Sequence, residues 1–229
     1  MNRKFPCLTF DCYGTLMDWE SGIKGTIKSI LDDKGVKGDV GKLFRTREDL
    51  EFDLIQSEYR GYREILALSL KETFLQFKIP YSNNDGQRLA ESVPDWPVFP
   101  DTVNSLARIG RGSKICVISN IDRDIIARTR DRLGVKFDLI VTAEEARAYK
   151  PSIRPFQLTL EKLKMRPSEV LHVSSGFRYD IPPALQLGFK TAWVNRGREN
   201  APVGFSADYE FSNLEDLAYF VENETASNV

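Results

Sequence analysis

Asp11 ends an apolar run, residues 5–10, and the turn-forming Gly14 follows three positions later. A buried strand that ends in a carboxylate and a glycine turn would place an acid at the carboxyl edge of a sheet, where open α/β folds bind their ligands. A carboxylate there can act as a nucleophile and form a covalent aspartyl ester. It can equally cap a helix or a turn, so this spacing alone leaves both interpretations open.

Polar side chains also follow two later stretches of the chain. Ser119 and Asn120 stand between the apolar run 115–118 and a predicted helix, where hydroxyl, amide and main-chain N–H groups can bind an anion. Simple helix capping is the alternative. Lys150 is followed by a proline, which disfavours helical geometry at the lysine. An isolated lysine is usually solvated, but an ammonium group close to Asp11 would keep that carboxylate ionised.

A fourth polar group follows the apolar run 170–173. Ser174 and Ser175 come directly after this run, and Asp180 stands further along at the start of the next predicted helix. Small hydroxyl groups and an acid in this arrangement can orient a water molecule, and helix capping by Asp180 is again the alternative. Each signal is modest by itself, and their joint arrangement is what predicts one site.

The elements that must position these side chains alternate in the second half of the chain. Continuous apolar runs predict strands covered on both faces at 115–119, 137–141, 170–174 and 190–194. Helical patterns lie between them, near 122–133, 155–165 and 180–187. Strand, helix and strand at this spacing predict an α/β fold with a doubly wound parallel sheet and a Rossmann-like core. Such a sheet would bring the polar groups to one edge.

The segment 18–97 has a different pattern. Apolar residues recur in it at helical spacing, and no convincing strand interrupts it. We therefore expect a helical cap at 18–97, inserted after the first strand. The hydrolase core would then consist of residues 1–17 and 98–229.

Composition narrows the possible partners and compartment. The chain has 229 residues, and its 41% hydrophobic content is enough to bury a core of this size. Its net charge of −1 gives no reason to expect nucleic acid or an anionic membrane as partner. No apolar run approaches the roughly 18 residues that span a bilayer. The three cysteines lack metal-ligand spacing and indicate reduced, buried thiols in a cytoplasmic protein.

The polar groups occur in the order Asp, Ser-Asn, Lys and Ser…Asp, and this set resembles the haloacid dehalogenase-like hydrolase superfamily over nearly the whole chain. Five segments are similar to its L-2-haloacid dehalogenase branch, namely 10–16, 95–102, 119–120, 149–151 and 191–196. A further relative in pattern is L-azetidine-2-carboxylate hydrolase. The resemblance implies a small anionic carboxylic-acid substrate, no cofactor and a homodimer.

Two positions favour displacement at carbon over phosphate transfer. Tyr13 stands two residues after Asp11, where phosphatases of the superfamily place the aspartate that protonates the leaving alcohol. Tyrosine holds its proton to a pKa of about 10, whereas a halide leaves without a proton. Ser175 stands five residues before Asp180, where those phosphatases carry a carboxylate for Mg²⁺. We therefore expect no catalytic metal.

The resemblance also implies a role for each site residue. Asp11 would attack C2 of a short 2-substituted carboxylic acid with inversion, and water would then hydrolyse the aspartyl ester. Lys150 would hold Asp11 as a carboxylate, and Asp180 would position the water. Thr15 would form a hydrogen bond near Asp11, and Tyr13 and Ser119 would contact the substrate. Asn120 and a cap arginine would solvate the halide. Ser174 and Ser175 would help to position the water.

Several positions depart from the branch or leave a choice. Arg45 fits the cap arginine best and Arg47 is the alternative, although either can be a solvated surface residue. Gly176 or Phe177 stands where the branch has an asparagine that holds the water. A Mg²⁺-dependent small-molecule phosphatase and a catalytically weak small-ligand binding protein therefore stay open as alternatives. His172, the only histidine, is interpreted as structural.

Overall fold

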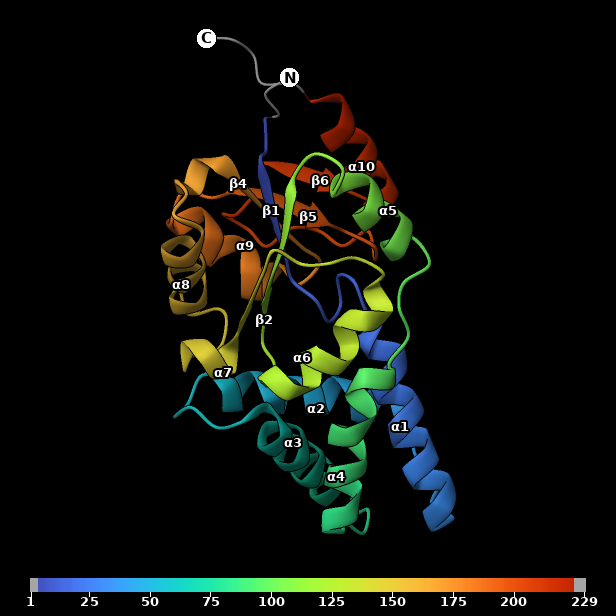
Figure 1. Ribbon diagram of the computed structural model, residues 1–229. Coiled ribbons are helices and arrows are strands. Elements are labelled where there is room, and N and C mark those ends of the chain that lie inside the picture. Colours follow the sequence, from blue (N-terminus) through green and yellow to red (C-terminus); the bar gives the residue numbers. More distant parts are fainter. Residues whose placement is uncertain (1–3, 225–229) are drawn as a thin grey trace. The chain divides into compact units, whose positions relative to one another are not determined.

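The computed structural model describes residues 4–224 and contains a parallel six-stranded sheet (Figure 1). Its strands are β1 (Cys7–Phe10), β2 (Lys114–Ser119), β3 (Leu139–Thr142), β4 (Val170–Ser174), β5 (Lys190–Val194) and β6 (Tyr209–Phe211). Their order is β3-β2-β1-β4-β5-β6, and every neighbouring pair is parallel. The doubly wound α/β class expected from the sequence is confirmed. Because β1 lies between β2 and β4, the residues that follow these three strands meet at one edge.

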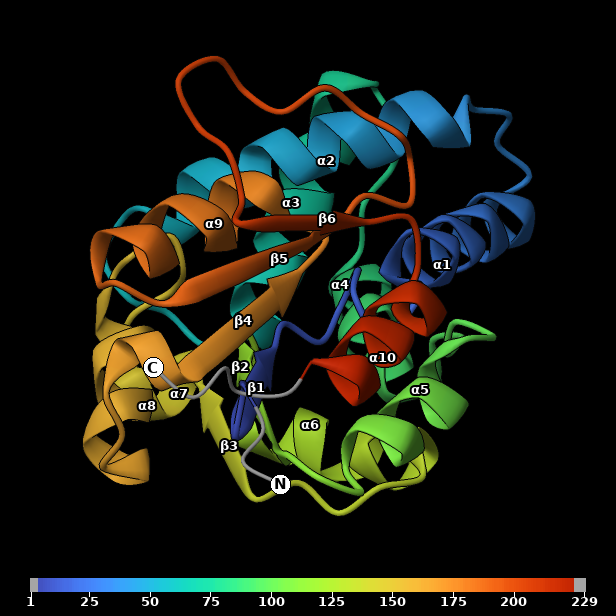
Figure 2. The same ribbon diagram turned by 90° about the horizontal axis from the view of Figure 1, so that it is seen from above.

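Helices cover both faces of the sheet (Figure 2). On one face, α8 (Arg154–Leu163) and α9 (Phe177–Gln186) pack against β2 to β5. On the other, α5 (Thr102–Ile109) packs against α10 (Leu214–Asn223). The first face contains an apolar cluster made of Cys7, Cys116, Ile118, Phe156, Val170, Ala184 and Phe189. Coverage of both faces explains why the strands read as continuous apolar runs.

Some elements differ from the expectations. The edge strand β6 has only three residues, none of them buried, so no continuous apolar run marks it. The predicted helix 122–133 is divided into α6 (Arg123–Thr129) and the 3₁₀ turn η2 (Arg130–Leu133). Helix α9 begins at Phe177, which places Asp180 in its first turn and not at its start. The short elements α7 (Ala143–Ala146) and η3 (Pro167–Glu169) complete this part of the chain.

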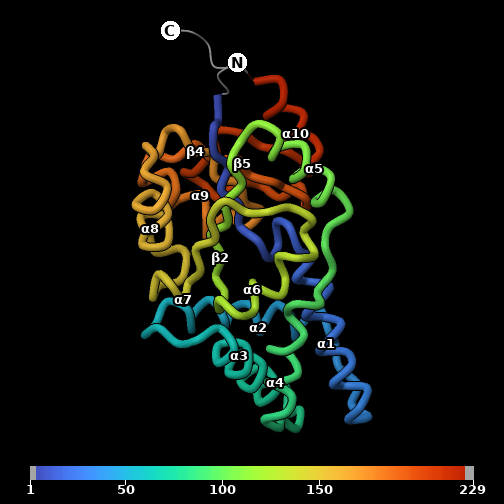
Figure 3. Tube along the Cα trace, viewed as in Figure 1, coloured from blue at the N-terminus to red at the C-terminus, as the bar shows by residue number. Residues whose placement is uncertain are grey.

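The chain divides into two compact units. The core unit contains the sheet and consists of the residues up to 17, 98–120 and those from 130 onward. The cap unit consists of 18–97 together with 121–129, a stretch that the sequence had placed in the core segment. Figure 3 follows the chain from β1 into the cap helices and back to α5.

All regular secondary structure in the cap unit is helical, with short loops between the helices. Its elements are α1 (Trp19–Lys34), α2 (Val40–Ile55), α3 (Tyr62–Gln76), α4 (Asn83–Ser92), the 3₁₀ turn η1 (Val93–Asp95) and α6. No helix within residues 4–224 is both long enough and apolar enough to cross a membrane.

Residues 121–129 join the cap because Asp122 caps one of its helices. The N-cap position of α3 is Gly61, which makes no side-chain cap hydrogen bond. The main-chain N–H groups of Tyr62 and Arg63 donate instead to Asp122 Oδ1 and Oδ2, at 2.8 and 3.0 Å. A carboxylate at a helix N-terminus is favourable because it satisfies N–H groups that have no partner inside the helix. This contact brings α6 to the cap helices.

Candidate active site

Asp11 is a buried carboxylate fixed on both oxygens. Its main-chain N–H donates to Val173 O at 2.9 Å, which continues the pairing of β1 with β4 by one residue. Its Oδ1 accepts a 2.9 Å hydrogen bond from Lys150 Nζ, and its Oδ2 accepts one of 2.8 Å from Thr15 Oγ1. The residue is only 8% exposed. Because a carboxylate has about four acceptor positions, each oxygen keeps a lone pair for further bonding.

Lys150 connects two carboxylates. Besides Asp11, its Nζ donates to Asp180 Oδ1 at 2.7 Å and to Ile118 O at 2.9 Å. These three bonds use all three ammonium hydrogens, and the residue is 1% exposed. The main chain of Lys150 is held by Asn120, whose Oδ1 accepts from Lys150 N at 2.7 Å and whose Nδ2 donates to Lys150 O at 3.0 Å. The ammonium therefore has a fixed position between the two acids.

The surroundings of Lys150 and Asn120 bear on two sequence predictions. Lys150 does not directly follow a strand, because α7 lies between it and the end of β3. The expected solvation of a halide by Asn120 stays a prediction, and the structure shows that its amide uses one N–H and its oxygen on the Lys150 main chain. One N–H of the amide is left for another partner. Ser119, the last residue of β2, is 3% exposed and lies beside Asn120 as the sequence indicated.

Asp180 is held more firmly than Asp11. Its Oδ1 accepts from Lys150 and from His172 Nε2, the latter at 2.8 Å, and its Oδ2 accepts from Ser174 Oγ at 2.8 Å. Ser174 Oγ accepts in turn from Gly176 N at 3.0 Å. Asp180 is 1% exposed. Its carboxylate is thus used inside the site and does not cap helix α9.

Ser175 is linked to Asp11 through Thr15. Its main-chain N–H donates to Thr15 Oγ1 at 2.9 Å, and its own Oγ lies 3.3 Å from the same hydroxyl. The carbonyl of Ser175 accepts from Trp193 Nε1 at 3.1 Å. Thr15, which is fully buried, therefore joins the segment after β4 to the nucleophile candidate.

The two carboxylates have opposite pKa shifts. Burial is the largest influence on Asp11 and raises its pKa; the charge of Asp180 adds to this, and Lys150 opposes it without reversing it. Burial also raises the pKa of Asp180, but Lys150 and the hydrogen bond from His172 outweigh it and the net shift is downward. Burial lowers the pKa of Lys150, yet both carboxylates together raise it above its ordinary value. Asp180 has the lower pKa because it receives more donors.

The loop after Asp11 is fixed from a distant part of the core unit. Gly14 has φ of +107°, a conformation that strongly favours glycine, and its N–H donates to Met17 O at 2.8 Å. Tyr13, which is half-buried, lies inside this turn. Arg196 Nη2 donates to Thr15 O at 3.0 Å, and Thr102 Oγ1 donates to Leu16 O at 2.9 Å. Tyr13 and Thr15 are thereby held in place by their main chain.

The sequence did not identify Arg196, His172 and Thr9 as functional, although all three lie in or around the site. Arg196, besides binding the loop, donates to both carboxylate oxygens of Asp101 at 3.0 Å. His172 contacts Asp180 directly, and its Nδ1 lies 2.9 Å from Thr9 Oγ1. Strand alternation could have pointed to Thr9 and His172, because residues two apart on a strand share a face. Thr9 precedes Asp11 by two positions, and His172 precedes Ser174 by two.

The two cap arginines have different surroundings within the cap unit. Arg47 is fully buried, forms an ion pair with Glu51 and donates to Ser69 Oγ at 3.2 Å. Arg45, one half-turn earlier on α2, is exposed. Because Arg45 is exposed and Arg47 is fully buried, we keep Arg45 as the first candidate of the two, and Arg47, whose Nε has no hydrogen-bond partner among the described residues, as the alternative.

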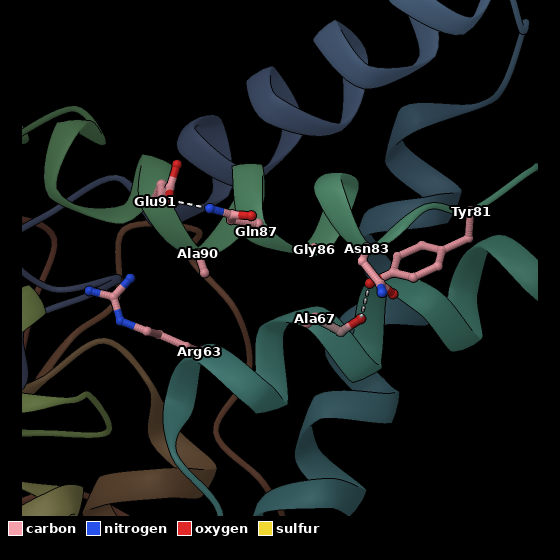
Figure 4. Close-up of a pocket in the computed structure, with 8 residues that line it drawn as sticks. All are labelled: Arg63, Ala67, Tyr81, Asn83, Gly86, Gln87, Ala90 and Glu91. Carbon is pink, nitrogen blue, oxygen red and sulfur yellow. Dashed lines mark hydrogen bonds between the residues drawn. The ribbon is translucent and has the colours of Figure 1, made fainter.

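A hollow of about 400 Å³ in the cap unit lies between α3 and α4 (Figure 4). It is lined by Arg63, Ala67, Tyr81, Asn83, Gly86, Gln87, Ala90 and Glu91. Some of its polar groups bond to the wall, as Tyr81 Oη does to Ala67 O at 3.4 Å and Gln87 Nε2 does to Glu91 at 2.8 Å. None of the site residues expected from the sequence lines it.

The residues present do not suit a divalent metal between the acids. The ammonium of Lys150 lies between Asp11 Oδ1 and Asp180 Oδ1, where a cation bridging the two would be placed. Ser175, which has no carboxylate oxygen to offer a hard cation, stands five residues before Asp180. Within residues 4–224, no group of three or more His, Cys, Asp and Glu side chains is arranged to hold a metal ion.

Comparisons with known proteins point to one family. A family model described as haloacid dehalogenase-like hydrolase matches residues 5–188. Haloacetate dehalogenase H-2 of Moraxella sp. (strain B) is 28% identical over 226 residues, 96% of this chain and 99% of that protein. (S)-2-haloacid dehalogenase 1 of Pseudomonas sp. (strain CBS-3) is 26% identical over 91% of this chain and 92% of its own. The crystal structure of the L-2-haloacid dehalogenase RSc1362 shares the fold, with a TM-score of 0.86 at 20% identity and coverage of 96% and 99%.

Proposed function

The chain belongs to the haloacid dehalogenase-like hydrolase family, and we propose that it displaces a halide from C2 of a short 2-halocarboxylic acid through a covalent ester on Asp11. One observation carries this proposal. Asp11 is a buried carboxylate held on one oxygen by Lys150 and on the other by Thr15, and no second acid stands two residues after it. This arrangement suits a nucleophile whose leaving group needs no proton.

The first step forms the ester. A carboxylate oxygen of Asp11 attacks C2, the carbon–halogen bond breaks, and the halide leaves with the bonding electron pair and inversion at C2. Lys150 keeps Asp11 ionised, while the upward shift of its pKa by burial makes the carboxylate more basic than an ordinary aspartate. Ser119 and neighbouring N–H groups bind the substrate carboxylate, and Arg45 solvates the halide in this proposal.

The second step regenerates the enzyme. Water attacks the carbonyl carbon of the Asp11 ester, Asp180 receives a proton from that water, and the bond between the acyl carbon and the substrate oxygen breaks. The departing alkoxide takes the second hydrogen of that water, which gives a 2-hydroxy acid and the free Asp11 carboxylate, and Asp180 then releases its proton to solvent. With Oδ1 as the carbonyl oxygen of the ester, the hydrogen bond from Lys150 favours the negative charge that develops on this oxygen as water attacks.

The names of the relatives set the first substrates to test. Relatives of this chain are called haloacetate dehalogenase and (S)-2-haloacid dehalogenase. We therefore propose chloroacetate and (S)-2-chloropropionate as probes, with azetidine-2-carboxylate as a probe of C–N cleavage at the same type of carbon.

The test is chloride release in the presence of EDTA. The wild-type protein should release chloride from at least one of the two haloacids, and the Asp11→Asn variant should not. Turnover in water enriched with ¹⁸O should label Asp11, because water attacks the aspartyl carbonyl and one aspartate oxygen leaves in the product. Chloride release equal to that of Asp11→Asn would refute the proposal.

Two further results would favour an alternative function over the proposed dehalogenation. Hydrolysis of p-nitrophenyl phosphate that requires Mg²⁺ would indicate the phosphatase alternative. A stable ester on Asp11, detected by intact mass without continued chloride release, would indicate a protein that reacts once and does not turn over. Both measurements use the same protein preparation, so the three outcomes can be compared directly.

A further inference from the structure

His172 is buried beneath the site and is bonded at both ring nitrogens. It lies on β4 directly beside Thr9 of β1, and both residues are fully buried. Its Nδ1 lies 2.9 Å from Thr9 Oγ1, and its Nε2 lies 2.8 Å from Asp180 Oδ1. The ring is packed edge-on against Phe156, with centroids 5.0 Å apart, and also approaches Phe189. The imidazole therefore has one orientation, with Nε2 directed at Asp180 and Nδ1 directed at Thr9.

The direction of the hydrogen bonds follows from the chemistry of the partners. An ionised Asp180 has no hydrogen to donate, so the hydrogen between it and His172 must be on Nε2. The hydroxyl of Thr9 can both donate and accept, so it matches Nδ1 in either protonation state of the ring. The contact with Asp180 is thus a charge-assisted donor bond, a class about twice as strong as a bond between neutral groups.

We infer that His172 is a positioning residue for the hydrolytic half of the reaction, acting through Asp180. This inference rests on the proposed function. The N–H of His172 fixes Oδ1 of Asp180 together with Lys150, so that Oδ2, which binds only Ser174 among these residues, keeps an acceptor position for water. His172 has no contact with Asp11, so the attack on the substrate does not depend on it.

The inference predicts that the two half-reactions separate in a His172 variant. In His172→Phe the ring volume between Phe156 and Phe189 is kept while both hydrogen bonds are lost. Ester formation, measured as the first burst of chloride, should stay within about threefold of wild type. Ester hydrolysis should slow by about 10- to 100-fold, as expected for the loss of a bond to a charged group. The Asp11 ester should then accumulate and be visible by intact mass.

Two amide variants give a sharper comparison. The amide nitrogen of His172→Gln reaches about as far as Nε2 and can donate to Asp180, so this variant should recover most of the hydrolysis rate. The shorter His172→Asn places its amide near Thr9 and should resemble His172→Phe. Thr159→Val is a matched control, because Thr159 is also fully buried in the core unit but bonds only to Pro155 O within its own helix. It should not change the ratio of the two rates.

The single histidine also permits a test that does not depend on activity. In ¹⁵N-labelled protein without a histidine tag, the imidazole spectrum contains His172 alone. We expect one tautomer with its hydrogen on Nε2, and a changed spectrum in Asp180→Asn. A mixture of tautomers, or a spectrum unaffected by Asp180→Asn, would overturn the inference.

The kinetic outcomes are equally decisive. Equal slowing of both half-reactions in His172→Phe, or a His172→Gln variant no better than His172→Phe, would contradict a positioning role. A wild-type protein that releases no chloride would refute the proposed function instead, and the imidazole spectrum would still decide whether His172 holds Asp180.

Discussion

Replacing Lys150 with methionine would remove the buried ammonium between two acids while keeping the length of the side chain. The lysine is 1% exposed, and its Nζ lies 2.9 Å from Asp11 Oδ1, 2.7 Å from Asp180 Oδ1 and 2.9 Å from Ile118 O. In Lys150→Met these carboxylates stay buried without a cation. Each of the two acids keeps its other hydrogen bonds, so the variant removes the ammonium and its three hydrogen bonds and leaves the rest of the site in place.

The expected loss of stability can be worked in two ways. Removing one partner of a buried ion pair costs about 3–5 kcal/mol. If the variant instead protonates one carboxylate, the cost is about 1.36 kcal/mol for each pH unit between an ordinary aspartate pKa of about 3.9 and pH 7. These roughly three pH units correspond to a cost of about 4 kcal/mol at pH 7. The two routes agree, so Lys150→Met should lower the free energy of unfolding at pH 7 by about 4 kcal/mol.

The sign of the pH dependence follows from the pKa shifts. The lowered pKa of Asp180 stabilises the wild-type fold above the unfolded pKa, and this stability is lost as pH falls through the folded pKa. Without Lys150 both carboxylates would have raised pKa values, so the variant would lose stability as pH rises through them. The difference between wild type and Lys150→Met should therefore shrink to about 1 kcal/mol near pH 4.5, where protonation is nearly free.

The activity of Lys150→Met should follow the protonation of Asp11. At pH 7 a protonated Asp11 cannot attack, so chloride release by Lys150→Met should fall by about 100-fold or more, and it should rise about tenfold per pH unit toward alkaline pH. Urea unfolding at pH 4.5 and 7 measures the stability, and chloride release from pH 6 to 9 measures the activity. Lys190→Met is the control, because its half-exposed pair with Asp208, at 2.7 Å, should contribute less than about 1 kcal/mol. A stability difference independent of pH would refute the reasoning.

Three other predictions concern single features of the site. Gly176→Ala would put a methyl group 3.4 Å from Asp180 Oδ2 without a backbone clash, and intact mass should show slower ester hydrolysis with normal unfolding by urea. In wild type, kcat/KM should fall as pH drops through the pKa of Asp11, at a pH above the ordinary 3.8, because burial and the charge of Asp180 raise that pKa. Arg45→Ala should reduce chloride release with little change in the melting temperature, whereas Arg47→Met should lower the melting temperature through its lost bonds inside the cap; the reverse pattern would remove Arg45 from the proposal.

The positions of several site residues could be predicted because they stand at the ends of buried strands or directly after them. Asp11, Ser119 and the end of β4 at Ser174 are marked by the change from an apolar run to polar residues. Parallel topology then brings these three strand ends together, because β1 lies between β2 and β4. Lys150 was harder to place, since it lies beyond α7 and its position depends on two main-chain hydrogen bonds with Asn120, one donated and one accepted by the Asn120 amide.

Partners inside the site could not be predicted in the same way. His172 was interpreted as a structural residue, and nothing in a continuous apolar run shows which nitrogen meets which group. Its contacts join β1, β4 and α9, with Thr9 separated from it by 163 positions. The start of α9 was placed too late, because the helix begins at Phe177 directly after Gly176, without a side-chain cap that the sequence could show. Such contacts depend on packing between distant segments, which a periodic pattern does not encode.

The arrangement of donors explains why two buried acids around one ammonium can have different chemistry. Burial alone would shift the pKa values of both carboxylates in the same direction, since Asp11 is 8% and Asp180 is 1% exposed. Asp11 receives one side-chain donor on each oxygen, whereas Asp180 receives three donors in total. Each added donor withdraws electron density from a carboxylate and makes it a weaker nucleophile, so the less saturated acid is the one suited to attack carbon. His172 supplies the donor that separates the two acids, and its removal should therefore make them more alike.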